Sequence, residues 1–235
     1  MNKILISGAF AVAMLPLAAL ANSGTVTQLA GTLSVQKADG SVRILSQRSE
    51  IQQGDTVNTQ KDSYAQIKFG DGAQITLKPN TSVKLEAFNF NQEEPAKDSF
   101  LYGLVKGGLR AVTGLVGKRG NSDAYKLTTS TATIGIRGTT FGADDCTGGG
   151  EPCQGLEAGV YVSVSDGEII ASNDAGSTSL VAGQFGLINS RDRQPRFLST
   201  DPGLQFTPPA SFIQSISGGS AVNSGRNLEC VVRSR

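Results

Sequence analysis

The clearest alternation of hydrophobic and polar residues runs through residues 64–77. Every second residue is apolar on each side of Asp71-Gly72, which divides the stretch in two. A period of two is typical of a half-buried β-strand, and an Asp-Gly pair accepts the positive φ angles of a type I′ turn. The stretch therefore predicts a β-hairpin with its apolar side chains on one face, which another sheet must cover.

Further strands are predicted on both sides of this hairpin. Runs that alternate, or that are rich in Thr, Val and Ile, are bounded by Gly, Asp, Asn and Pro. The expected extended segments are residues 24–35, 41–45, 56–57, 83–87, 125–141, 159–164, 168–171 and 180–188. Turns are expected at Asp39-Gly40, Pro79-Asn80 and Asp166-Gly167, and the polar residues 89–98 are expected to form an exposed loop.

Residues 100–116 fit two patterns. Their apolar residues could line one face of a helix. Four glycines within the run would each cost about 1 kcal/mol in a helix. We therefore expect two strands around the Gly107-Gly108 pair, with a short helical turn near Leu115-Val116.

Together these segments predict an all-β fold, a twisted antiparallel β-sandwich of jelly-roll character with a core of Val, Ile, Leu and Phe. Residues 22–189 form the expected domain, although the order of its strands does not follow from the sequence. Residues 190–235 contain prolines and paired glycines with little periodicity, and predict a loosely structured C-terminal tail. The tail residues that could pack onto the sandwich are Phe197, Phe206 and Phe212.

Composition narrows the chemistry. The chain has 21 Lys and Arg, 20 Asp and Glu, and no His. Without histidine, Ser-His-Asp and Cys-His nucleophile pairs and His-ligated metal sites are excluded. The near-neutral charge gives no electrostatic reason to bind nucleic acid or an anionic membrane. We therefore expect a protein that is not an enzyme, with no catalytic residues, no cofactor and no metal site.

The three cysteines have different roles. Cys146 and Cys153 flank a glycine-rich segment that could close as a small loop, and they predict a local disulfide in an oxidising compartment. A redox-active pair is the alternative, but the Cys-x-x-Cys spacing is missing. Cys230 is left over and could be free or pair with another chain.

The N-terminus has the pattern of an export signal. Lys3 supplies a positive charge, residues 4–17 are uncharged, and Ala19-Leu20-Ala21 is the small-x-small pattern that a signal peptidase recognises. A retained membrane anchor is the alternative, but the apolar run is short and contains Pro16. We expect residues 1–21 to be a cleaved signal peptide and the mature chain to have no transmembrane helix.

Three segments resemble the periplasmic domain of the FecR family, in the order that the family shows them. They are residues 65–83 (AQIKFGDGAQITLKPNTSV), 104–114 (LVKGGLRAVTG) and 131–141 (TATIGIRGTTF). The likeness covers roughly residues 24–188. It implies a β-rich periplasmic domain of a Gram-negative bacterium that works by binding. In signalling members of the family this domain contacts an outer-membrane transporter and passes the signal to a cytoplasmic sigma factor.

The third segment contains the candidate interaction or structural residues. These residues are Gly135, Ile136, Arg137, Gly138, Thr139, Thr140 and Phe141. Arg137 could present its guanidinium to a partner. We favour the alternative, a partly buried arginine that satisfies main-chain carbonyls at a strand end. The remaining basic residues of interest, expected to form a solvated face, are Lys106, Arg110, Lys118 and Arg119.

The chain departs from the signalling members of the family. It has an export signal in place of a cytoplasmic anti-sigma segment, and no internal transmembrane helix is expected. We therefore expect a non-enzymatic periplasmic binding module that contacts a protein partner in an envelope signalling or assembly system. A secreted structural or surface protein is the alternative, and a glycan-acting enzyme is a remote one, because no pair of acids forms a recognisable signature.

Overall fold

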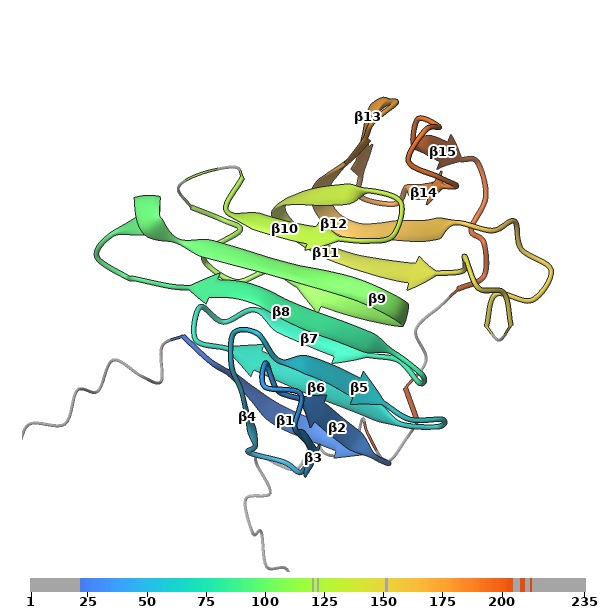
Figure 1. Ribbon diagram of the computed structural model, residues 1–235. Coiled ribbons are helices and arrows are strands. Elements are labelled where there is room, and N and C mark those ends of the chain that lie inside the picture. The colour runs from blue at the N-terminus through green and yellow to red at the C-terminus, as the bar shows by residue number, and fades with distance from the viewer. Residues whose placement is uncertain are drawn as a thin grey trace, which may run out of the picture.

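The protein is an extended stack of β-strands (Figure 1). The computed structural model describes residues 22–119, 121, 123–150, 152–204, 208, 209 and 212. Within them, 15 strands form one hydrogen-bonded sheet. The predicted all-β fold is confirmed. The predicted signal peptide, Phe206 and Cys230 lie outside the described residues.

The strands follow one another with short connections. Their bounds are β1 (Gly24–Ala30), β2 (Leu33–Gln36), β3 (Val42–Leu45), β4 (Glu50–Ile51), β5 (Thr56–Thr59), β6 (Tyr64–Phe69), β7 (Gln74–Leu77), β8 (Ser82–Asn89), β9 (Ser99–Val112), β10 (Tyr125–Thr128), β11 (Thr133–Asp145), β12 (Val160–Asn173), β13 (Gly176–Val181), β14 (Phe185–Ile188) and β15 (Arg196–Leu198). A 3-10 helix, η2 (Pro95–Lys97), lies in the loop expected at residues 89–98. The strand β15 falls in the expected tail and pairs with β14, so the ordered domain extends past residue 189.

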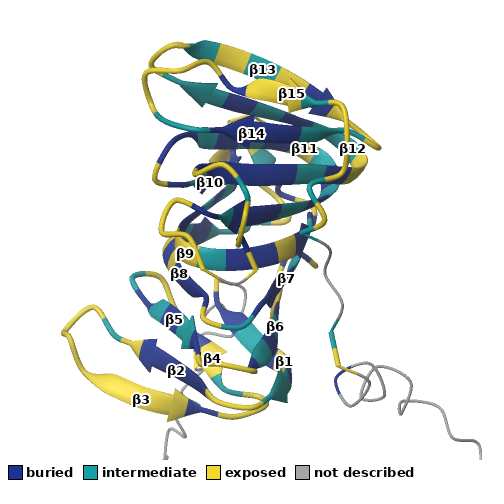
Figure 2. Ribbon diagram, turned by 90° about the vertical axis from the view of Figure 1, so that its right-hand side faces the viewer, coloured by how far each residue is buried: buried dark blue, intermediate teal, exposed yellow. Residues whose placement is uncertain are grey.

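The sheet is folded into two layers. Layer A contains, in hydrogen-bonded order, β3, β2, β5, β8, the first half of β9, β10, the first half of β11, the second half of β12, and β13. Layer B contains β4, β1, β6, β7, the second halves of β9 and β11, the first half of β12, β14 and β15. Neighbours are antiparallel except β9 and β10, which are parallel. Near the N-terminal end, Figure 2 shows β2, β3 and β5 on one side and β1, β6 and β7 on the other.

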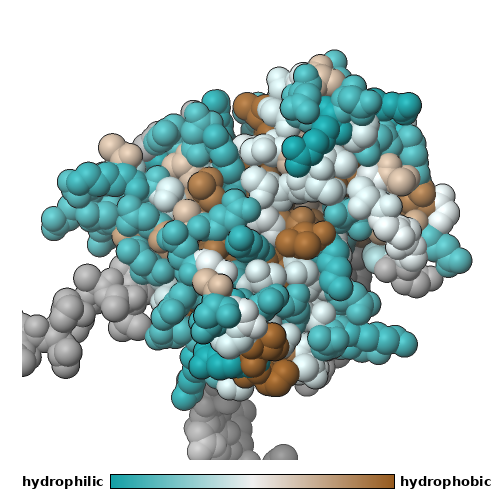
Figure 3. Space-filling model, viewed as in Figure 1, coloured by the Kyte–Doolittle hydropathy of each residue, from teal (hydrophilic) through white to brown (hydrophobic). Residues whose placement is uncertain are grey.

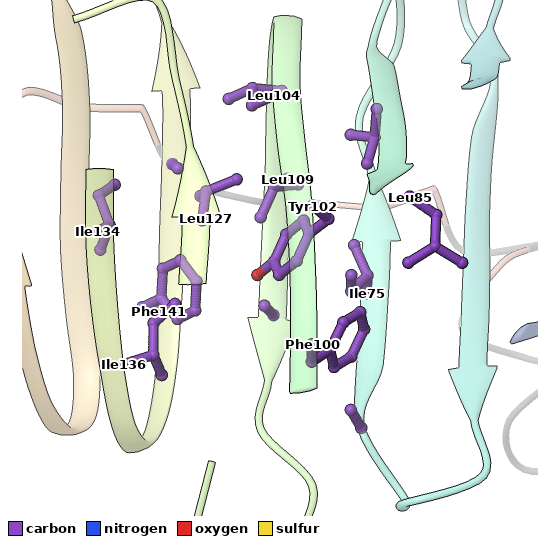
Figure 4. Packing of buried hydrophobic residues seen from close by; sticks show 14 of the residues in the cluster. Ile75, Leu85, Phe100, Tyr102, Leu104, Leu109, Leu127, Ile134, Ile136 and Phe141 are labelled. Atoms are coloured by element: carbon purple, nitrogen blue, oxygen red, sulfur yellow. The ribbon is translucent and has the colours of Figure 1, made fainter. Parts of the chain in front are cut away.

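The core lies between the two layers because each strand places alternate side chains inward. Figure 4 shows Phe100, Tyr102 and Leu127 from layer A together with Ile75, Leu109 and Phe141 from layer B. Phe69 of layer B lies 4.5 Å from Phe100 of layer A between ring centroids, so aromatic contacts join the layers directly.

Three long strands have one half in each layer. Because they connect the two layers by continuous hydrogen bonding, the sandwich is a single sheet. The strands β9, β11 and β12 each bend where a glycine has a positive φ: Gly107 at 82°, Gly138 at 60° and Gly167 at 78°. Residues with a Cβ atom disfavour positive φ angles, whereas glycine adopts them readily. The two facing layers of the expected sandwich are present, but they are halves of one continuous sheet.

Several predictions are wrong because they do not distinguish a glycine at which a strand bends from one at which the chain reverses. Residues 99–112 form one bent strand in place of two, and β12 passes through Asp166-Gly167 without reversing. Residues 180–188 were expected as one strand, but they contain the end of β13, a turn at Gly183, and β14. A positive φ serves both a bend and a reversal, so the glycine alone does not distinguish them.

The hairpin predicted at residues 64–77 is confirmed, with a different turn. The strands β6 and β7 pair with Ile67 opposite Ile75. The Phe69 N–H donates to the Ala73 carbonyl at 2.9 Å, and Gly72 is the residue of the turn with a positive φ. This is a three-residue connection, so the expected two-residue type I′ turn is wrong.

Asp71 gives the physical reason for this turn. Its side chain points into the protein and is buried, and its two carboxylate oxygens accept hydrogen bonds from the N–H groups of Ala73 and Val116. Burial raises the pKa of the Asp71 carboxyl, and these hydrogen bonds offset part of the increase. Asp71 therefore ties the hairpin to the turn that follows β9, where the predicted helical turn is present.

Candidate functional site

The family motif, residues 135–141, lies where β11 passes from layer A to layer B. Ile136 and Phe141 are buried in the core on the two sides of the bend at Gly138. The Thr139 carbonyl accepts a hydrogen bond from the Thr113 N–H at 2.9 Å. The motif therefore builds the crossing between the layers.

The other members of the motif flank this bend. Gly135 pairs with Ile170 in layer A, and Thr140 pairs with Asp166 at the start of the layer B half. Arg137 lies opposite Glu168 in the strand pairing, and its side chain is exposed and makes no hydrogen bond or ion pair with any residue that the structure describes. Our favoured interpretation of Arg137 as a partly buried donor to main-chain carbonyls is wrong, since its side chain is exposed. A role toward a partner stays a prediction.

A row of residues crosses the outer face of layer B in register. From β6 to β14 its members are Gln66, Thr76, Arg110, Gly142, Ser163 and Phe185. Residues next to them along the strands, such as Leu109 and Val162, are buried in the core. Because successive side chains on a strand point to opposite faces, the row points outward.

This row forms the floor of a groove of about 660 Å³, which we call the layer B groove. The C-terminal residues that line it are Asp201, Pro202, Leu204, Pro208 and Phe212. Phe212 is buried and its ring centroid lies 6.1 Å from that of Tyr64, which confirms the prediction that this phenylalanine packs onto the domain. Phe197 is 51% exposed, so the same prediction is wrong there.

A buried ion pair lies at one side of the groove. The Lys78 Nζ atom lies 2.7 Å from Asp144 Oδ1 and 2.9 Å from Oδ2, and it donates to the Leu204 carbonyl at 3.0 Å. The pair spans β9 at Gly108, where a Cβ atom would overlap both side chains. Burial raises the pKa of the Asp144 carboxyl, and the Lys78 ammonium offsets part of this effect.

Arg110 is the groove residue whose charge is not compensated. Its side chain is exposed and makes no hydrogen bond or ion pair within the described ranges. The basic residues expected to form one solvated face do not do so, because the Arg119 side chain contacts Asp98 and Phe90. Arg119 pairs with Asp98 at 3.2 Å, and its guanidinium carbon lies 4.8 Å from the centroid of the Phe90 ring.

The predicted disulfide is present. Cys146 and Cys153 are bonded, with their Cα atoms 5.4 Å apart. They form a small buried cluster with Tyr161 and Leu187, beside the groove. The disulfide holds a loop against the outer side of layer B, and its two cysteines are not part of the main core.

The arrangement is suited to recognition. In the part of the chain that the structure describes, no group of three or more His, Cys, Asp or Glu side chains is placed to hold a metal ion. None of its helices is long and apolar enough to cross a bilayer. Asp144, the buried carboxylate of the groove, is held by Lys78, so the groove offers fixed hydrogen-bonding groups and one available guanidinium.

The groove was missed by sequence reasoning. The alternation in residues 64–77 does indicate that Gln66 and Thr76 point away from the core. The pairing of Lys78 with Asp144 depends on the register of β7, β9 and β11 across 66 residues of chain. Nothing in the local pattern signals that register.

The fold defines an all-β protein whose single sheet forms two layers, with a polar groove on one outer face. Residues 55–170 match the family model described as FecR protein, so this part of the chain is a FecR domain. The match runs from the residue before β5 into the second half of β12, and it contains all three segments on which the resemblance was based. No curated protein matches the chain.

Among solved structures, the chain aligns with two crystal structures of a proposed anti-sigma factor from Parabacteroides distasonis. Their TM-scores are 0.46 and 0.45, both at 13% sequence identity, and the alignments cover 63% of this chain and 60% of the other. The chain thus spans about 60% of the length of these structures. At this level the likeness supports no inference about function.

Proposed function

We propose that the chain is a non-enzymatic binding module of the periplasm that contacts a protein partner in an envelope signalling or assembly system. The observation that carries this proposal is the FecR match at residues 55–170, with its three ordered segments. Signalling members of the family use this kind of domain to contact a protein.

The surface is consistent with a module that binds through one chosen region. Among the described residues, the exposed large hydrophobic side chains are those of Val42, Ile44, Val105, Leu115, Val181 and Phe197. Figure 3 shows brown areas scattered over one face. The layer B groove, in contrast, combines apolar walls with a polar floor and an uncompensated arginine. A concave site with a small number of converging polar groups is the usual form of a recognition site.

Export is part of this proposal. Residues 1–21 are proposed to direct the chain across the inner membrane and then to be removed after Ala21. A disulfide between Cys146 and Cys153 fits an oxidising compartment, because such bonds are rare where thiols are kept reduced.

The test is expression of the full chain in a Gram-negative host, with fractionation, intact-mass measurement and lysine-directed crosslinking in the periplasm. We expect a mature chain that begins at Asn22, recovery in the periplasmic fraction, and a crosslinked envelope protein identified by mass spectrometry. Retention in the cytoplasm with residues 1–21 intact would contradict the proposed location. Recovery only from the medium, without a crosslinked partner, would favour a secreted structural protein.

A further inference from the structure

We propose that the layer B groove binds an acidic, extended peptide segment of the protein partner, with Arg110 receiving its carboxylate. This inference rests on the proposed function, since it assigns a surface and a ligand chemistry to the binding module. It is carried by the shape of the groove, by the charges that line it, and by the Ser163 hydroxyl that approaches over Gly142 beside Arg110.

The charges that line the groove leave Arg110 as the available cation. The other cation, Lys78, is occupied by Asp144 and by the Leu204 carbonyl. The remaining acid, Asp201, accepts a hydrogen bond from the Gly203 N–H at 2.8 Å on the C-terminal wall. A guanidinium in this position offers two parallel donors to a carboxylate.

Gly142 allows a hydroxyl group to approach the strand next to Arg110. It lies between Arg110 and Ser163 in the row, and a Cβ atom on it would come within 2.8 Å of the Ser163 Oγ atom. The Ser163 hydroxyl therefore leans over the glycine, toward the arginine. A ligand oxygen placed above Gly142 can accept from both groups.

The rest of the groove fits a peptide in extended conformation. Its apolar lining is provided by Phe185 of β14 and by Pro202, Leu204, Pro208 and Phe212 of the C-terminal wall. Neighbouring strands lie roughly 4.8 Å apart, so the row of six residues spans roughly 24 Å. An extended chain that follows the row can place alternate side chains toward the apolar wall and toward Arg110.

The experiment uses the mature, disulfide-bonded protein labelled with ¹⁵N and two peptides that differ in one group. The probes are acetyl-Thr-Val-Glu-Val-Thr-amide and the same peptide with Gln in place of Glu, titrated while NMR signals are recorded. We expect the Glu peptide to shift the Arg110 side-chain Nε–H and the Gly142 and Ser163 amides in a saturable manner. The Gln peptide is expected to bind roughly tenfold more weakly or worse, because a charge-assisted hydrogen bond is lost.

The variants Arg110→Gln and Lys84→Gln form a matched pair. Both remove an exposed positive charge from a β-strand, Arg110 in layer B and Lys84 in layer A, and spectra of the free variants verify that both fold. Arg110→Gln should weaken binding of the Glu peptide roughly tenfold, and Lys84→Gln should leave its affinity unchanged. Equal binding of the two peptides, no saturable shift at the groove, or a loss caused by Lys84→Gln alone would overturn the inference.

The same variants separate this inference from the proposed function. If a periplasmic partner is captured equally by the wild type and by Arg110→Gln, the binding module stands and the groove assignment is wrong. If the peptide binds at Arg110 but no periplasmic partner is captured, the groove assignment stands and the proposed function is wrong.

Discussion

At the scale of single residues, Lys78 and Asp144 form a buried ion pair in which each charge has a partner. Both residues are buried, and the ammonium contacts both carboxylate oxygens and the Leu204 carbonyl. Removing two charges from water is costly, and their attraction compensates only when the geometry is good and further hydrogen bonds are made. Gly108 supplies that geometry because it leaves room above β9.

Replacement of Lys78 by methionine should therefore destabilise the protein. Lys78→Met keeps the length of the side chain but leaves Asp144 buried without a counter-ion, and it should lower the free energy of unfolding by about 3 kcal/mol at neutral pH. Denaturant unfolding followed by circular dichroism measures this difference. The control Lys97→Met removes an exposed ion pair with Glu94 and should cost less than about 1 kcal/mol.

The deficit of Lys78→Met should depend on pH in a defined direction. Burial raises the pKa of Asp144, and the loss of the ammonium raises it further. A carboxyl whose pKa is higher in the folded state favours folding below its unfolded value of about 4, and this contribution is lost as the pH rises through the folded value. The difference from the wild type should thus shrink as the pH falls toward 4. A deficit that stays constant from neutral pH to pH 4 would contradict this assignment.

At the scale of elements, the central feature is the set of three strands that serve both layers. The strands β11 and β12 run side by side and cross together, and the glycines at their bends pack closely: a Cβ atom on Gly167 would lie 2.5 Å from the Gly138 carbonyl oxygen. Both the positive φ and the close approach require glycine. The family motif and its partner strand thus act as one structural unit.

Gly167→Ala should lower the free energy of unfolding more than the same replacement at another glycine with a similar φ angle. Gly183 is the matched control, because its φ of 83° is close to the 78° of Gly167 and nothing lies within 4 Å of its Cβ position. Gly183→Ala should cost about 1 to 2 kcal/mol of backbone strain, and Gly167→Ala about 2 kcal/mol more from steric overlap. Equal destabilisation in thermal unfolding would show that the crossing tolerates a side chain.

The strands also show which features of the fold could be predicted from the sequence and which could not. Alternation located the hairpin of β6 and β7, and glycines marked the bends of β9 and β12, because these signals are local. The register that brings Arg110, Gly142 and Ser163 into one row is set by contacts between strands far apart in the chain. The inward turn of Asp71 likewise depends on the N–H of Val116, so the hairpin alone predicts the wrong turn type.

At the scale of the whole molecule, the two outer faces differ. The outer face of layer B carries the groove and is lined by C-terminal residues, whereas Arg137 and Lys84 are exposed in layer A outside this groove. The FecR match spans strands of both layers. If the protein is a binding module, this asymmetry predicts that its partner contacts layer B.

Site-specific photo-crosslinking in the periplasm tests that claim most directly. A benzophenone side chain would be placed at Ser165, an exposed residue that lines the groove, and in a second variant at Lys84, an exposed residue of β8 in layer A. The account predicts that Ser165 crosslinks an envelope protein, that this product is lost in combination with Arg110→Gln, and that Lys84 gives no such product. Capture of the partner from Lys84 and not from Ser165 would contradict the account.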